Sequence, residues 1–218
     1  MARPGLGSAL VNYTDKYQFT TRLCVNNQSV EVIDSTRLLG TIIEKDLTWV
    51  SNTAAIVRKA NVRMELLRKV SSFGASVEDM KTIYTLFVRS LLEQSATVWH
   101  SSLTQGNCDD LERVQKSAFK IILGEKYKSY ADSLTKLDMQ SLYDRREQLC
   151  LNFALKCVKN PKSAQMFPLN DKNHAMGRIN PEKFKVQHAL NGRLKNSPVI
   201  YMQSLLNKHE SEQMLIEK

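Results

Sequence analysis

The chain has 218 residues and a formal net charge of +9, from 31 Lys and Arg against 22 Asp and Glu. This length corresponds to one domain or two small ones, and a hydrophobic content of 42% is enough for a packed core without disulfides or metal. The sequence has no long apolar run and no secretory signal, so we expect no membrane span. The positive charge favours a polyanionic partner such as nucleic acid, although charge also serves solubility.

The four cysteines, Cys24, Cys108, Cys150 and Cys157, are too few and too scattered for a disulfide framework. We therefore expect a reducing compartment and an intracellular protein, nuclear or cytoplasmic. Cys150 and Cys157 share one face of a predicted helix and are interpreted as core residues. No histidine lies near a cysteine pair spaced for zinc, so we expect neither a metal nor another cofactor.

The N-terminal quarter of the chain has the composition of short strands. Residues 1–14 show no clear period and are predicted to be an unstructured start. Residues 15–50 are rich in Thr, Val and Ile, with short alternations that break at Asn26-Asn27 and at Gly40. We predict two or three short strands, a small hairpin or meander, with a hairpin turn at Asn26-Asn27.

After Trp49 apolar residues recur with the period of a helix, which predicts a mainly α fold with a bundle of four to five helices over residues 51–160. The second helix is apolar around most of its circumference, so we place it, with Phe87, at the centre of the bundle. The predicted helix ends, in chain order, are Phe73-Gly74, Ser76, Thr104 or Asn107, Gly124, Asp138 and Asn160-Pro161.

The C-terminal part, residues 161–218, is rich in Pro and has few clustered apolar residues. We predict a partly ordered basic extension, in which residues 199–209 can form a last helix that packs back or stays apart. Between residues 172 and 195 the acidic residue is Glu182, and the basic residues are Lys172, Arg178, Lys183, Lys185, Arg193 and Lys195.

Two acidic segments resemble catalytic sites. Tyr130-Ala131-Asp132-Ser133 is similar to the Y-x-D-D box with which reverse transcriptases hold two metal ions, but Ser133 replaces the second carboxylate. The pair Asp109-Asp110 falls in the first turn of a predicted helix, where the helix dipole accounts for it. Because two-metal chemistry needs converging carboxylates, we expect no catalytic residue and no enzymatic activity.

Basic residues of the first helix are the first candidates for ligand contacts. On a helical wheel Arg58 and Lys69 lie opposite the apolar stripe, and Lys59 and Arg68 lie at its margins. Arg63 falls inside the stripe. Because a buried arginine needs a partner, Arg63 is predicted to be either a structural ion pair or a group directed at a ligand.

A second row of basic residues follows the third helix. Arg113, Lys116 and Lys120 share its outward face, and Lys126 and Lys128 follow. Each row by itself is typical of a solvated helix surface. Two rows of one sign on neighbouring helices also fit a groove that follows nucleic-acid phosphates, and the two interpretations stay open here.

The order and spacing of several segments resemble the carboxy-terminal region, thumb and post-thumb, of reverse transcriptases from non-LTR, LINE-like retrotransposons. These enzymes are RNA-directed DNA polymerases. The resemblance runs from about Tyr17 to Pro168, and more loosely to His209. The segments that carry it are TRLLGTIIEKDLTW, IVRKANVRMELLRKVSSFG, IYTLFVRSLLEQSATVWHSSLT, LERVQKSAFKIILG and LYDRREQLCLNFALKC.

This resemblance implies that Leu38-Leu39-Gly40 belongs to the hairpin after the catalytic palm, and that the helices from Asn52 onward form a thumb that grips template and primer. The palm and its aspartates would precede Tyr17, so the resemblance implies a truncated fragment without polymerase activity. The missing palm domain would be its natural packing partner. The nucleic-acid-binding role would fall to Arg58, Lys59, Arg63, Arg68, Lys69, Arg113, Lys116 and Lys120.

Two functions are compatible with this sequence, and neither involves a small-molecule substrate. The first is a fragment that binds duplex or RNA–DNA hybrid through its backbone. The second is a helical scaffold or protein-interaction module, in which Trp49, Trp99 and the strands at 30–43 form an apolar surface that a palm would cover.

Overall fold

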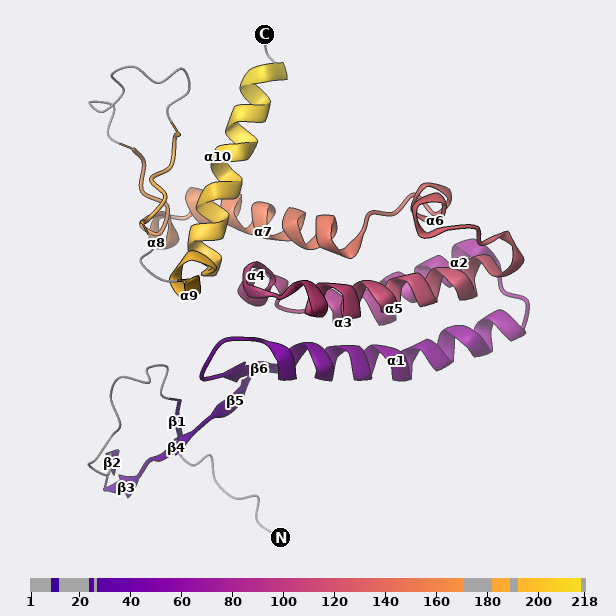
Figure 1. The fold of residues 1–218 in the computed structure, drawn as a ribbon, viewed down its shortest axis with the longest axis horizontal. Coiled ribbons are helices and arrows are strands. Elements are labelled where there is room, and N and C mark those ends of the chain that lie inside the picture. The colour runs from indigo at the N-terminus through magenta and orange to yellow at the C-terminus, as the bar shows by residue number, and fades with distance from the viewer. Residues whose placement is uncertain (1–8, 12–23, 26, 171–181, 189–191, 217–218) are drawn as a thin grey trace.

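The computed structural model describes residues 9–11, 24–25, 27–170, 182–188 and 192–216 (Figure 1). Most of the predicted unstructured start, and the basic residues Lys172 and Arg178, lie outside these ranges. The described chain is mainly α, with a small N-terminal β segment before a helical bundle, as the sequence predicts.

The β segment consists of three two-stranded pairs. β1 and β4 pair in parallel, whereas β2–β3 and β5–β6 are antiparallel hairpins. In the first hairpin Val25 pairs with Gln28, and Asn27 has positive φ, whereas Asn26 of the predicted turn lies outside the described residues. β1 falls in the predicted unstructured start, and that expectation is wrong there because its partner lies some twenty residues away, beyond any local period. The strands are β1 (Ala9–Val11), β2 (Cys24–Val25), β3 (Gln28–Ser29), β4 (Glu31–Ile33), β5 (Ser35–Leu38) and β6 (Thr41–Glu44).

The β5–β6 hairpin is fixed to the start of the first helix. Its turn residues Leu39 and Gly40 both have positive φ, 48° and 87°, as a two-residue type I′ turn requires. The Ile42 amide donates to Asn52 Oδ1 at 3.1 Å, and Ser51 Oγ donates to Glu44 at 2.6 Å. These bonds set the direction in which the helix leaves the hairpin.

The helical bundle begins with the long helix α1 (Val50–Ser72), which packs against α5 (Gln105–Leu123), and the two run side by side in Figure 1. The remaining elements of the bundle are α2 (Val77–Ile83), η1 (Tyr84–Arg89), α3 (Ser90–Glu93), α4 (Ala96–Trp99), η2 (His100–Ser102), η3 (Gly124–Lys126), α6 (Tyr130–Lys136) and the first half of α7 (Leu142–Lys159).

Side chains from these elements form the main core. The geometry of η1 determines which residues of its helical run are buried in that core. η1 is a π-helical segment, whose wider turn lets Tyr84, Val88 and Leu92 share one fully buried face. Phe87 is 48% exposed, so its predicted central position is wrong. The helical wheel fails here because it assumes the α-helical period. Trp49 and Trp99 are also buried, and therefore they form no exposed surface.

Among the described residues, serine or threonine side chains cap the starts of α2, α5, α6 and α7. Ser76 and Thr104 accept the amide bonds expected of them, and Gly74 and Gly124 have positive φ after their helices. Ser141 caps α7 by accepting from the Asp144 amide, so the predicted start at Asp138 is wrong. Asp138 instead follows the C-terminal end of α6, with φ 46°.

A buried polar network lies within the main core, around Gln115. Its Oε1 accepts from Tyr84 Oη at 2.6 Å, and its Nε2 donates to Tyr130 Oη at 2.8 Å and to the Gln140 carbonyl at 2.9 Å. Tyr130 donates in turn to Glu112. The network therefore joins η1, α5, α6 and the start of α7 through bonds that only one arrangement of these elements satisfies.

A second, smaller core lies in the C-terminal part, where the sequence predicts a partly ordered extension. α10 packs against the second half of α7, and Cys150 and Cys157 lie in this core as expected. Asn207 of α10 bonds both the amide and the carbonyl of Phe184. The predicted terminal helix is therefore present and longer than expected. The C-terminal helices are α8 (Pro161–Ala164), α9 (Gly192–Lys195) and α10 (Pro198–Ile216).

Two further observations concern the described residues as a group. None of their helices is both long and apolar enough to pass through a bilayer. All four cysteines are free thiols, and Cys24 is the exposed one.

Candidate nucleic-acid interface

The basic row of α1 lies on the surface. Arg58, Lys59, Arg68 and Lys69 are all exposed. Within the described residues no hydrogen bond or ion pair engages the side chains of Arg58, Lys59 or Lys69, whereas Arg68 pairs with Glu65 in its own helix. Three of these four cations are thus free to meet an external anion.

Arg63 does not lie buried within the apolar stripe, where the sequence placed it. It is exposed, and its Nη1 donates to the Phe87 carbonyl of η1 at 2.6 Å. Its Cα lies at the edge of the stripe, and the long side chain reaches across to the neighbouring helix. The predicted structural ion pair is wrong, since the partner is a backbone carbonyl.

The basic row of α5 is also exposed, but its members have partners. Arg113 pairs with Asp110 at 2.7 Å. Lys116 Nζ lies 5.1 Å from the ring centroid of Tyr130, and Lys120 Nζ lies 5.6 Å from that of Tyr127. Surface contacts of this kind contribute about 1 kcal/mol or less, so phosphate groups can compete for these cations.

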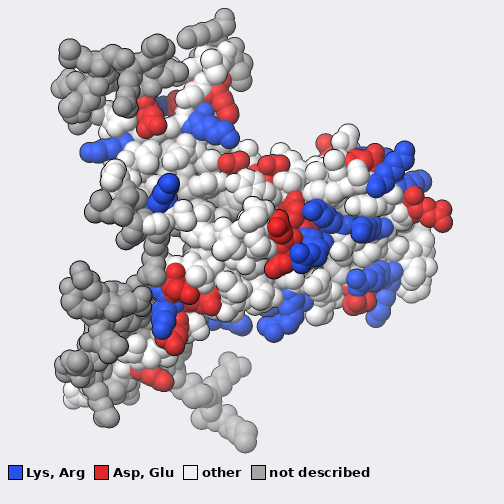
Figure 2. Space-filling model, viewed as in Figure 1, with Lys and Arg blue, Asp and Glu red and all other residues white. Residues whose placement is uncertain are grey.

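The two rows lie on adjacent helices, because α1 packs directly on α5. On the face of the molecule seen in Figure 2, Lys and Arg side chains lie in several groups over both helices, with Asp and Glu side chains between them. Acidic side chains, Glu65 and Asp110 among them, interrupt this basic face. The sequence thus correctly placed two basic rows on neighbouring helices.

The two acidic segments have structural roles. Asp132 lies in the first turn of α6, capped by Ser129, and pairs with Lys136 at 2.8 Å. Asp109 accepts from Gln105 at 2.9 Å, but it lies beyond the first turn of α5, so its predicted first-turn position is wrong. Among the described residues no three His, Cys, Asp or Glu side chains gather into a group that could hold a metal ion.

Sequence reasoning missed Arg146, which is fully buried in α7. Its Nε lies 3.4 Å from His100 Nδ1, and neither Nη has an oxygen or nitrogen partner among the described residues. Burial lowers the pKa of Arg146. Burial, and then the Arg146 charge, lower the pKa of His100 to about 4. Arg146 lies four residues from both Leu142 and Cys150, so the helical wheel that singled out Arg63 could have found it.

A scan of protein-family models and searches of curated proteins and of solved structures found no match to this chain. The resemblance to reverse transcriptases therefore stays a prediction from the residues.

Proposed function

We propose that the helical bundle binds the sugar–phosphate backbone of duplex nucleic acid or RNA–DNA hybrid through the basic face of α1 and α5, and that it does not extend a primer. The observation that carries the proposal is the set of exposed cations on two packed helices, of which Arg58, Lys59 and Lys69 have no partner among the described residues.

The length of the basic row fits a backbone ligand. Arg58 and Lys69 are eleven residues apart, which corresponds to about 16 Å along an α-helix. Successive phosphates of one strand are spaced by about 3.4 Å along the duplex axis, so the row spans several of them. Flexible cations without fixed partners contact phosphates without base readout, and therefore binding should tolerate changes of sequence.

A salt titration tests this proposal. A labelled RNA–DNA hybrid should bind with a log Kd that depends on log salt, at a slope of about 0.9 for each phosphate contact, or about 0.7 on single strands. Replacing Arg113, Lys116 and Lys120 together by Gln should flatten the slope by about two to three units. These side chains are exposed, so the fold should persist.

A matched control removes the same charge from another exposed surface. Lys156, Lys159 and Lys162 are exposed near the junction of α7 and α8, and their triple Gln variant should keep the wild-type slope. Equal slopes for both triple variants would mean that binding depends on the net charge of the chain and not on the position of the charges. That result would remove α5 from the interface.

An exposed apolar group favours the alternative, a scaffold or protein-interaction module. Val62 and Leu66 of α1 are 69% and 43% exposed, and Leu86 and Phe87 of the adjacent η1 are 61% and 48% exposed. Such a group is typical of an interaction surface. If the hybrid fails to bind at low salt, this alternative replaces the first proposal, and Leu86→Ser with Phe87→Ser then tests it through loss of partner binding.

A further inference from the structure

A second cationic site lies apart from the residues of the α1 and α5 rows. Arg89 of η1 and Arg145 of α7 converge on one carboxylate oxygen, Glu93 Oε1 of α3, with Nε–Oε1 distances of 3.4 and 3.1 Å. Their side chains are only 21% and 36% exposed, and that of Glu93 is 14% exposed. With Glu93 between them, the two arginines leave one net positive charge in this half-buried place.

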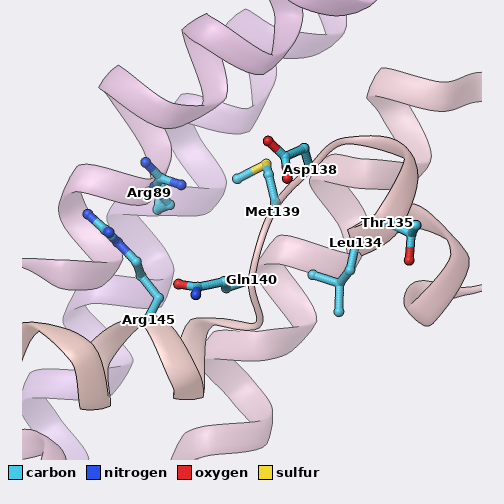
Figure 3. A pocket seen from close by; sticks show the side chains of 7 residues that line it. All are labelled: Arg89, Leu134, Thr135, Asp138, Met139, Gln140 and Arg145. Carbon is cyan, nitrogen blue, oxygen red and sulfur yellow. The ribbon is translucent and has the colours of Figure 1, made fainter. Parts of the chain in front are cut away.

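The two arginines line a cavity of about 490 Å³. Figure 3 shows it bounded by these guanidinium groups on one side and by the α6–α7 loop on the other. The remaining lining residues are Leu134, Thr135, Asp138, Met139 and Gln140. This volume falls within the range of about 300–1,000 Å³ that is typical of small-ligand pockets.

The hydrogen-bonding capacity of the two arginines is mostly unused. The Nε atom of each arginine contacts the Glu93 carboxylate. Within the described part of the chain, no hydrogen bond or ion pair engages an Nη atom of Arg89 or Arg145. Paired guanidinium forks match the oxygens of a phosphate group. Glu93 neutralises one of the two positive charges and fixes both side chains in place.

The opposite wall is held rigidly. Gln115 of the buried network donates to the Gln140 carbonyl at 2.9 Å, and the Met139 amide donates to the Leu134 carbonyl at 2.9 Å. Leu134 and Met139 also pack on the main core. The wall is therefore held in place before a ligand binds, and the site needs little ordering on binding.

We propose that this cavity binds a phosphomonoester, the terminal phosphate of a nucleotide or of a nucleic-acid end, between Arg89 and Arg145. A phosphomonoester carries close to two negative charges at neutral pH, and three terminal oxygens can accept from the two forks. Asp138 lines the other side of the cavity, where its carboxylate repels the negative charge of the ligand.

Calorimetric titration of the full chain with adenosine 5′-monophosphate, with adenosine and with 5′-phosphorylated and 5′-hydroxyl dinucleotides tests the proposal. Each phosphorylated ligand should bind at least about tenfold more tightly than its unphosphorylated counterpart, since charge-assisted bonds are lost without the phosphate. The stronger of the two phosphorylated ligands tells whether the source is a free nucleotide or a strand end. Equal binding with and without the phosphate overturns the proposal.

Variants locate the binding. Arg145→Lys keeps a charge for Glu93 but loses the fork, and should weaken phosphomonoester binding about tenfold while the chain melts as wild type. Asp138→Asn should tighten it several-fold. The triple Gln variant of Arg113, Lys116 and Lys120 should leave it unchanged, which separates this site from the backbone interface. Wild-type affinity in Arg145→Lys places the phosphate elsewhere and overturns the proposal.

Discussion

Polar groups lie both on the outer face of α1 and α5 and in the interior behind it. The two sets differ in their exposure to solvent and in their hydrogen bonding. On the outer face Lys59 and Lys69 are exposed and have no partner among the described residues. In the interior Gln115 is fully buried, and both its donor and its acceptor atoms have partners. The charged groups on this surface are therefore available to a ligand, whereas the hydrogen-bonded polar groups in the interior fix the arrangement of the helices.

The largest expected difference is in the cost to stability of truncating two side chains of the same helical run, Leu92 and Phe87. Leu92→Ala should cost about 2–5 kcal/mol of unfolding free energy, because Leu92 is fully buried. Phe87→Ala should cost about 1 kcal/mol, since nearly half of Phe87 faces solvent. Urea unfolding measures both, and equal costs would contradict the division between interior and surface that η1 sets.

Gln115→Leu tests the interior network. It leaves the Gln140 carbonyl and the Tyr84 hydroxyl without their partner, and should cost about 2–4 kcal/mol. Adding Tyr84→Phe removes one orphaned group and should restore part of the loss. Gln148→Leu is the control, because Gln148 is exposed and bonds only Asn152 among the described residues. A neutral Gln115→Leu would show that the network does not hold the bundle.

His100 should make stability depend on pH. Its folded pKa of about 4 lies below its ordinary value of 6.5, so the unfolded chain binds the proton more readily. This contribution is complete above pH 6.5 and is lost as the pH falls to 4, by about 3 kcal/mol in all. His100→Gln should flatten the profile between these limits. An unchanged profile would mean that His100 does not titrate in this way.

Arg146→Met tests whether the buried charge of Arg146 lowers the stability of the fold. Two Nη atoms without oxygen or nitrogen partners make the wild-type charge costly, so this change should be neutral or stabilising by about 1 kcal/mol. It should also raise the pKa of His100, which nuclear magnetic resonance can follow. A large loss of stability would mean that Arg146 has a stabilising partner in solution.

Arg63→Met should have the smallest effect on stability. The exposed side chain makes one hydrogen bond to a carbonyl, so we expect a cost of about 1 kcal/mol or less. If Arg63 belongs to the basic face, the same variant weakens hybrid binding. Wild-type melting together with wild-type binding at low salt would remove it from the interface.

Local signals predicted much of the fold, and partners distant in sequence account for the rest. Ser76 and Thr104 were found because a cap is a short-range pattern. The sequence predicted Asp138 as the cap of α7, whereas the structure has Ser141 at that position. The π-helical turn at η1 has no periodic signature, and Phe184 meets Asn207 across 23 residues. The Arg89–Arg145 cavity was missed for the same reason, because it joins Arg89 to residues 134–145, which are distant in sequence.

The most direct test of the basic face is whether its two rows bind one ligand together. Salt titrations of an RNA–DNA hybrid should be compared for wild type, for the triple Gln variant of α5 and for a triple Gln variant of Arg58, Lys59 and Lys69. Each triple variant should lower the slope by about two to three units, and the combined variant by the sum. A combined variant that binds with the wild-type slope would contradict the proposed interface.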